Sequence, residues 1–191
     1  MTEDELLSIL ENLSLSEREH IIEQLVKSED DIVELLVSIV RNNDGRQSWL
    51  AASALSHIED DRVIPALISA LSKSNLSDAT QVMLIEMLGD KGDMQVLCPL
   101  IKMLNSKNLV VQMATIQALI KLPDNRSILA LMTLLEQTES SSLRYTIIEA
   151  LGDLGISQAI ELIQRFRNDE DHHVRRRVER ALEKLTQQET R

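Results

Sequence analysis

An internal repeat with a period of 31 to 33 residues constrains this chain more than any other feature. A small or unbranched residue followed by Leu recurs at that period, and ten residues before each pair stands a residue able to cap a helix. Such a period is typical of helical repeat proteins, in which each repeat is one supersecondary unit. The pairs begin at Ala54, Met87, Ala118, Ala150 and Ala181, and their caps are Asp44, Ser77, Asn108, Ser140 and Asp171.

Within each period the apolar residues follow helical spacing. Ile64, Leu67, Ile68 and Leu71 fall at i, i+3, i+4 and i+7, which places them on one face of a helix. Short breaks rich in Gly, Asp or Pro, such as 152–155, separate the capped helix from a second one. Gly can end a helix and Asp can cap the next, so each period predicts one helical hairpin.

The repeat also predicts the organisation of the chain. We expect repeats at 44–74, 75–106, 107–138 and 139–169, a half-repeat at 170–186 and a tail at 187–191. Residues 1–43 form an N-terminal helical cap, with helices over 3–13, 16–27 and 30–42 and a degenerate repeat at about 16–43. One hairpin cannot bury its apolar face alone, so stacked neighbours supply the core. The predicted fold is all-α, a right-handed α-solenoid of stacked antiparallel helical hairpins.

Composition agrees with that fold and excludes others. Aromatic residues make up 2% of the chain, whereas β-sandwiches and barrels rely on aromatic and β-branched residues with many Gly and Pro turns. A hydrophobic content of 43% with only five Gly and three Pro excludes a disordered chain. The composition is therefore consistent with helices that pack through Leu, Ile, Val, Met and Ala.

Charge restricts the partners. The formal net charge of −11 opposes nonspecific nucleic-acid binding, because a polyanion repels so acidic a chain. Residues 1–44 hold 12 Asp/Glu against 3 Lys/Arg, whereas residues 165–191 hold 8 Lys/Arg against 6 Asp/Glu. The asymmetry is consistent with soluble terminal caps or with an electrostatic partner surface.

The chain reads as a cytoplasmic protein. Its single cysteine, Cys98, excludes an intramolecular disulfide and fits a reducing compartment. The N-terminus is acidic, without the basic start of a secretory signal, and no apolar run is long enough to span a bilayer. We therefore expect a soluble protein with no membrane insertion.

The repeat resembles a known family. The HEAT-repeat proteins of the short variety found in phycobilisome lyase subunits carry Asp-x-x-Val-Arg, then Ala-x-x-Ala-Leu-Gly-x-Leu-Gly-Asp, then Ala-x-x-x-Leu. The present chain is similar over about residues 44–186. The matches are Leu143-Arg144 with 149–155 and Ala159, and Asp171 with Val174-Arg175 and Ala181-Leu182. The middle repeats depart: Ser48, Gln81 and Gln112 replace the Arg.

Motifs for chemistry are scarce. Gly89-Asp90-Lys91-Gly92 lacks the strand and the following Lys-Ser/Thr of a phosphate loop, so we interpret it as a turn. The His residues show no zinc-ligand spacing; His172-His173 forms a solvated first turn or, alternatively, a metal or anion contact. Cys98 is packed or partly exposed. We assign no catalytic residue, no metal and no cofactor.

One pattern on the second helices carries more information. In the resembled fold these helices line the concave face. Aligned by repeat, eight positions include four basic residues and no acidic one, which reverses the charge of the chain. We name these positions the second-helix stripe: Arg62, Gln95, Arg126 and Gln158 in its first row, and Ser69, Lys102, Thr133 and Arg165 in its second. The basic residues of the stripe lie there by chance, at helix ends, or they bind an acidic protein segment or another anionic ligand.

Two further features are noted at the ends of the repeat region. A C-terminal basic surface at Arg175, Arg176, Arg177 and Arg180 is a solvated cap or a docking surface. Trp49 is expected in the core, the alternative being an exposed contact. DNA binding is disfavoured because aromatic side chains for stacking are nearly absent.

The function expected from the sequence is a non-catalytic protein–protein interaction module, a scaffold, adaptor or assembly factor. Its protein partner, with an acidic segment, would bind along the concave face, because a stacked helical scaffold offers a large surface and no ready-made pocket. The resemblance implies an alternative: a subunit or relative of the bilin lyases, which attach or detach tetrapyrrole chromophores on phycobiliproteins. A bilin or phycobiliprotein is a partner only under that alternative.

Overall fold

The computed structural model describes residues 1–28, 32–42, 45–73 and 76–189, and all regular structure within them is helical. None of the helices in these ranges is long and apolar enough to cross a membrane. The helices are α1 (Glu3–Asn12), α2 (Leu15–Ser28), α3 (Ile32–Asn42), α4 (Arg46–Ser56), α5 (Val63–Leu71), α6 (Asp78–Lys91), α7 (Leu97–Met103), α8 (Leu109–Ile120), α9 (Asn125–Gln137), α10 (Ser141–Asp153), α11 (Ile160–Gln164) and α12 (His172–Glu189). Short 3-10 turns η1 (Met94–Val96) and η2 (Ser157–Ala159) precede α7 and α11.

The caps predicted from the repeat begin these helices. Ser77 accepts a hydrogen bond from the Thr80 N–H at the start of α6, and Ser140 does the same for Leu143 at the start of α10. Asn108 caps α8, and Asp171 accepts the His173 N–H at the start of α12. The remaining predicted cap, Asp44, lies outside the described residues. Four of the five caps are therefore confirmed.

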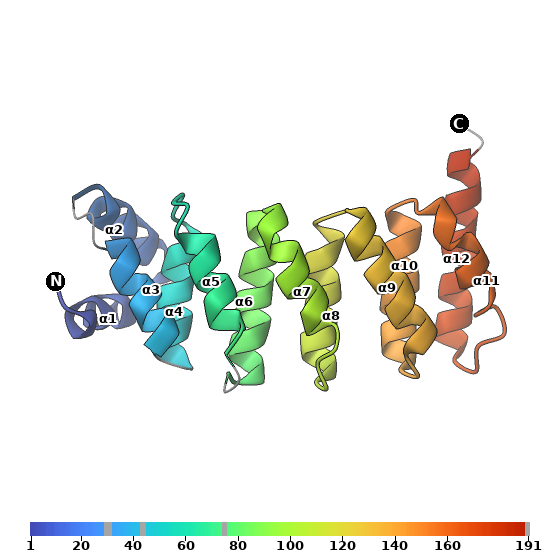
Figure 1. Ribbon diagram of the computed structural model, residues 1–191, viewed down its shortest axis with the longest axis horizontal. Helices are drawn as coiled ribbons and strands as arrows, with labels where there is room; N and C mark the ends of the chain where they lie inside the picture. The colour runs from blue at the N-terminus through green and yellow to red at the C-terminus, as the bar shows by residue number, and fades with distance from the viewer. Residues whose placement is uncertain (29–31, 43–44, 74–75, 190–191) are drawn as a thin grey trace. The chain divides into compact units, whose positions relative to one another are not determined.

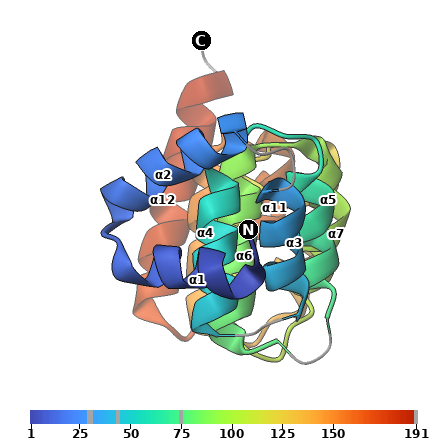
Figure 2. The ribbon, with the colours of Figure 1, turned by 90° about the vertical axis from the view of Figure 1, so that its left-hand side faces the viewer.

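The chain divides into two compact units, residues 1–100 and 101–191. In unit 1, α4 packs on α6 and α3 packs on α5, and each hairpin joins the two layers. Figure 2 shows α3 and α5 on one side and α4 and α6 on the other, with α1 and α2 across the end of the stack. The all-α arrangement of stacked antiparallel hairpins predicted from the sequence is confirmed within this unit.

Unit 2 repeats the arrangement. Its first-helix layer is formed by α8, α10 and α12, with α9 and α11 packed beside them (Figure 1). Fully buried aliphatic side chains lie in each layer: Leu67 and Leu84 in unit 1, and Leu131 and Ile147 in unit 2. Each such side chain stabilises the fold by roughly 1.5–3 kcal/mol through removal of apolar surface from water. The domain and repeat boundaries stay predictions, and those at 43/44 and 74/75 fall outside the described residues.

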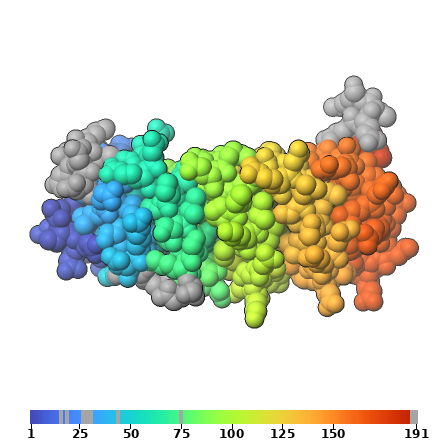
Figure 3. All heavy atoms as spheres, viewed as in Figure 1, coloured from blue at the N-terminus to red at the C-terminus, as the bar shows by residue number. Residues whose placement is uncertain are grey.

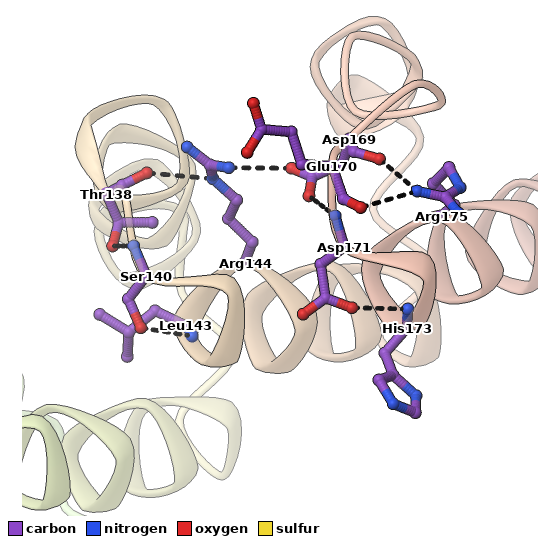
Figure 4. Close-up of polar contacts among 9 residues, drawn as sticks. All are labelled: Thr138, Ser140, Leu143, Arg144, Asp169, Glu170, Asp171, His173 and Arg175. Atoms are coloured by element: carbon purple, nitrogen blue, oxygen red, sulfur yellow. Dashed lines mark hydrogen bonds and ion pairs between the residues drawn. The ribbon is translucent and has the colours of Figure 1, made fainter.

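In the last two repeats, the Arg of the family pattern hydrogen-bonds to the turn that precedes its helix. Arg144 in α10 donates from Nε to the Thr138 carbonyl at 3.1 Å and from Nη1 to Asp169 at 2.9 Å. Arg175 in α12 donates to the carbonyls of Asp169 and Glu170, so Asp169 lies between the two guanidinium groups (Figure 4). These bonds satisfy turn carbonyls that would otherwise lie unpaired at a repeat junction.

The substituted repeat keeps the same function with a shorter side chain. Gln112 in α8 donates from Nε2 to the Leu104 carbonyl at 2.8 Å, at the turn that precedes its own hairpin. Ser48 cannot reach so far: its hydroxyl is buried and has no hydrogen-bond partner among the described residues. The departure from the family pattern at Gln112 is thus conservative in effect, whereas the one at Ser48 is not.

Candidate functional site

The second-helix stripe is exposed at all eight positions. In unit 1, Arg62 lies just before α5, Ser69 within it and Gln95 in η1. In unit 2, Lys102 lies in α7, Arg126 and Thr133 in α9, Gln158 in η2 and Arg165 just after α11. Figure 3 views the surface that the second helices of each unit form. Each half of the stripe is therefore open to solvent.

Arg62 is engaged by two carboxylates. Its Nη2 lies 2.8 Å from Asp60 Oδ2, and its Nη1 lies 3.4 Å from Glu34 Oε1 of α3. The Arg62 side chain and its own backbone N–H donate to Asp60, and these bonds lower the pKa of Asp60 to about 2. The Arg62 pKa is raised in return, chiefly by the hydrogen bond to Asp60. The positive charge of Arg62 is thus balanced by neighbouring carboxylates.

The same arrangement recurs in unit 2. Asp124 caps α9 and accepts from Arg126 Nε at 2.9 Å, and the Arg126 side-chain bond lowers the pKa of Asp124. Arg165 Nη1 lies 2.8 Å from Glu136 Oε1, which joins the end of α11 to α9. Lys102 is exposed and forms no ion pair with any residue in the described ranges.

The sequence contains a signal for these partners that the charge alignment overlooked. An Asp whose carboxylate accepts a backbone N–H stands two residues before three positions of the first row, at Asp60, Asp93 and Asp124. Asp93 accepts the Gln95 N–H at 2.7 Å, as the other two accept from Arg62 and Arg126. Three of the four cations of the stripe, Arg62, Arg126 and Arg165, are therefore paired locally, whereas Lys102 has no ion pair within the described ranges. Exposed pairs of this kind contribute only about 0–1 kcal/mol each, so an incoming carboxylate can compete for them.

The C-terminal basic surface divides into two kinds of residue. Arg175 is held by turn carbonyls, and Arg177 is mostly buried, with its guanidinium 4.2 Å from the centre of the Tyr145 ring and hydrogen-bonded to Glu149 and to the Tyr145 hydroxyl. Burial first, and the charge of Arg180 second, lower the pKa of Arg177. Arg176 and Arg180 are exposed. The two exposed arginines are the ones open to a partner.

A groove of about 400 Å³ runs between α10 and α12. Arg177, Arg180 and Lys184 line it together with three carboxylates, Glu149, Asp153 and Glu183. Lys184 is hydrogen-bonded to Asp153. The groove is balanced in charge, so it holds no strong preference for an anion or a cation.

The other residues named from the sequence also have clear positions. Trp49 is 42% exposed, so the expectation that it lies in the core is wrong: its position on α4 faces a groove and not the stacked interior. Cys98 is exposed. Asp171, His172 and His173 bring ligand atoms within 4.8 Å of one another, but Asp171 is used as a helix cap, and the His173 N–H lowers its pKa.

Comparison with known families identifies the repeat. Residues 68–144 and 128–191 match the family model described as HEAT repeats, which together covers well over half of the chain. Residues 49–73 match the model described as the PBS lyase HEAT-like repeat.

Comparison with individual proteins agrees with the match to the PBS lyase HEAT-like repeat. The chain is 28% identical over 173 residues to the phycocyanobilin lyase subunit alpha of Picosynechococcus sp. strain PCC 7002, covering 81% of this chain and 65% of that protein. A solved structure of the complex of CpcE and CpcF of phycocyanin lyase from Nostoc sp. PCC7120 matches with a TM-score of 0.64 and 26% identity, covering 83% of this chain and 66% of that chain. The chain thus spans just under two thirds of the length of these relatives.

An engineered protein of known structure matches with a TM-score of 0.53 and 21% identity, covering 97% of this chain and 96% of its own. At that identity it supports the fold alone.

The similarity to lyase subunits corrects one expectation. The prediction of a non-catalytic scaffold or adaptor is wrong, because the relatives that match are subunits of a lyase. The error arose because a repeat fold carries many activities, so the absence of a recognisable catalytic motif has little weight.

Proposed function

The chain belongs to the HEAT-repeat family, and on that premise we propose that it is a subunit of a lyase that attaches tetrapyrrole chromophores to phycobiliproteins or detaches them. The observation that carries the proposal is the similarity to the phycocyanobilin lyase subunit alpha along 81% of this chain. The structural likeness to the CpcE–CpcF complex supports it.

The proposed lyase acts as a complex. The solved relative contains two chains, so we infer that this chain binds a second protein subunit. Binding and orientation are the tasks that suit a rigid stack of hairpins: holding two reactants in a fixed geometry removes much of the entropy cost of their encounter. We place the reaction in the cytoplasm, where the exposed thiol of Cys98 stays reduced.

The second-helix stripe is the proposed contact for carboxylates. Guanidinium groups match carboxylate oxygens in a two-point geometry, and the surface pairs at Arg126 and Arg165 are weak enough to exchange. Lys102 offers a cation without a competing ion pair in the described part of the chain. The carboxylates come either from the propionate groups of a bilin or from an acidic protein segment. The exposed Arg176 and Arg180 are a second proposed contact.

Pigment transfer tests the proposed function. The purified chain is mixed with phycocyanobilin and apo-phycocyanin, alone and with the CpcF subunit of the Nostoc relative, and visible absorbance is followed. A covalently coloured phycocyanin subunit after denaturing electrophoresis is the expected result. If no absorbance change and no transfer occur in either mixture, the lyase assignment is discarded.

A second experiment tests the stripe. The triple variant Lys102→Glu, Arg126→Glu and Arg165→Glu should weaken binding of free bilin if the ligand is a propionate, and weaken only subunit binding if it is an acidic segment. The matched control reverses three exposed cations of the same unit outside the stripe, Lys107, Lys121 and Arg167. Equal behaviour of the two triple variants would show that the stripe has no special role.

A further inference from the structure

A groove between α4 and α6 in unit 1 combines an exposed indole with flexible apolar side chains. It has a volume of about 430 Å³, and Trp49, Met83 and Met87 form its apolar part. Trp49 belongs to α4, and both methionines belong to α6. The groove lies on the first-helix layer of the unit, so it is separate from the second-helix stripe.

The side chains in this groove are those that proteins use to bind other proteins. The chain has a single Trp, and 42% of its surface is exposed, although burial would stabilise so large an apolar group. Trp and Met are enriched at interfaces, where Trp dominates the binding energy and Met adapts its shape to the partner. An exposed Trp beside two Met residues therefore marks a contact surface.

Charge decides which partner fits. Glu86 and Asp90 line the groove from α6, and both are exposed. The cation of the groove, Lys91, donates from Nζ to the Ile58 carbonyl at 2.9 Å, and burial lowers its pKa. Residues 1–100 hold 19 Asp/Glu against 7 Lys/Arg, a net charge of −12, whereas residues 101–191 have a net charge of +1 from 13 Lys/Arg and 12 Asp/Glu. The net negative charge of the chain thus comes from the unit that carries this groove.

We propose that the groove between α4 and α6 binds a cationic amphipathic helix of a protein partner. An apolar side chain of that helix lies against Trp49 and Met87, and its Lys or Arg residues face Glu86 and Asp90. A helix laid in an apolar groove is a common mode of peptide recognition, and the field of the unit steers a cationic segment toward it. A free tetrapyrrole fits less well, because its carboxylates would meet two carboxylates at the groove. The proposal stands apart from the lyase function and holds whichever reaction the protein serves.

The single Trp allows the groove to be observed directly. Two synthetic peptides of about 16 residues carry Leu at the same i, i+3, i+4 and i+7 positions, one with Lys and the other with Glu at the flanking positions. Titration of the full-length chain with the Lys peptide should shift the Trp49 emission to shorter wavelength and saturate. The Glu peptide should produce no shift, and added salt should weaken the binding of the Lys peptide.

Variants separate the groove from the general acidity of the unit. The double variant Glu86→Gln and Asp90→Asn should bind the Lys peptide about tenfold more weakly, and its binding should depend less on salt. The control double variant Glu11→Gln and Asp61→Asn removes the same charge at exposed carboxylates outside the groove, and should bind within about twofold of the parent chain. Trp49→Ala should lower the affinity for the Lys peptide about tenfold or more. Because this variant has no Trp, its binding is measured by the fluorescence anisotropy of a labelled Lys peptide.

Several results would overturn the proposal. Equal binding of the Glu and Lys peptides excludes charge selection, and equal losses in the two double variants exclude a specific groove. Unchanged peptide binding by Trp49→Ala excludes the indole contact, and Met87→Ala repeats that test if Trp49→Ala fails to fold by circular dichroism. Saturable quenching of Trp49 by phycocyanobilin, without any effect of the Lys peptide, would assign the groove to the pigment.

Discussion

Gly152 in α10 lies so close to Ala181 in α12 that a methyl group at Gly152 would be 2.7 Å from the Ala181 Cβ and 2.9 Å from its Cα. The sequence pattern predicts that Gly152 helps to end its helix. In the structure α10 continues through Gly152 to Asp153, and Gly152 is buried. Gly is required there for the close approach of two helices, and the turn is made by Gly155, whose φ is +71°.

Gly152→Ala should therefore destabilise the chain, although Ala favours a helix by about 1 kcal/mol over Gly. The added methyl group meets the α12 backbone, which cannot give way as a flexible side chain can. We expect a net loss of about 1–3 kcal/mol in the free energy of unfolding, measured by urea denaturation. The control is Ser142→Ala at an exposed position of the same helix, which should change little. A variant as stable as the parent would mean that α10 and α12 can separate without cost.

The ion pair between Arg144 and Asp169 gives a second prediction. The Asp169 side chain is only 4% exposed, and the Arg144 side chain 25%. Arg144→Ala leaves the buried carboxylate with the Asp171 N–H as its other hydrogen-bond donor, so we expect a loss of roughly 2–4 kcal/mol. Arg144→Lys should recover only part of the stability that Arg144→Ala loses, because Lys has no planar group that binds the Thr138 carbonyl and Asp169 together.

A double-mutant cycle isolates that interaction. Arg144→Ala, Asp169→Ala and the double variant are compared by urea denaturation, and the double variant should lose less than the sum of the two single losses. Additive losses would show that Arg144 stabilises the fold through contacts other than Asp169, namely the Thr138 carbonyl and the Phe166 ring.

The repeat in the sequence was enough to predict the helices and most of their caps. Ser77, Asn108 and Ser140 are local signals, because a cap acts on the first turn of its own helix. Hydrophobic periodicity was nearly as informative: Leu67 and Leu71 are buried as expected, whereas Ile64 and Ile68 on the same predicted face are half-buried. That difference depends on which neighbour covers the helix, which the pattern of one helix does not contain.

The candidate site was less accessible to sequence reasoning. Glu34 pairs with Arg62 across 28 residues, and Glu136 pairs with Arg165 across 29, so only the stacking of hairpins brings these charges together. Trp49 shows the same limit, since its helix has one face on the core and another on the groove beside α6. The second-helix stripe itself stays a prediction, because exposure alone does not show what binds there.

Ser48 leads to a prediction of increased stability. Its hydroxyl is buried and has no hydrogen-bond partner among the described residues, and an unpaired buried polar group costs about 1–3 kcal/mol. Ser48→Ala should therefore raise the melting temperature. Ser53→Ala on the same helix is the control, because its side chain is half-buried and the change there measures helix propensity alone. Equal effects of the two substitutions would mean that the Ser48 hydroxyl has found a partner.

The hydrogen bonds between Asp60 and Arg62 predict a pH dependence. They lower the pKa of Asp60 to about 2 in the folded chain, whereas an unfolded Asp titrates near about 3.9. The stabilisation is thus fully present above about pH 4 and is lost as the pH falls toward about 2. Asp60→Asn should melt below the parent at pH 6, and most of this gap should be lost at pH 2, where Asp60 of the parent is about half protonated. Because both side chains face solvent, we expect a gap of no more than about 4 °C that shrinks in high salt. Thermal melts followed by circular dichroism measure it, with Asp61→Asn as the exposed control. A gap that persists unchanged at pH 2 would assign the stabilisation to the shape of the Asp60 side chain and not to its charge.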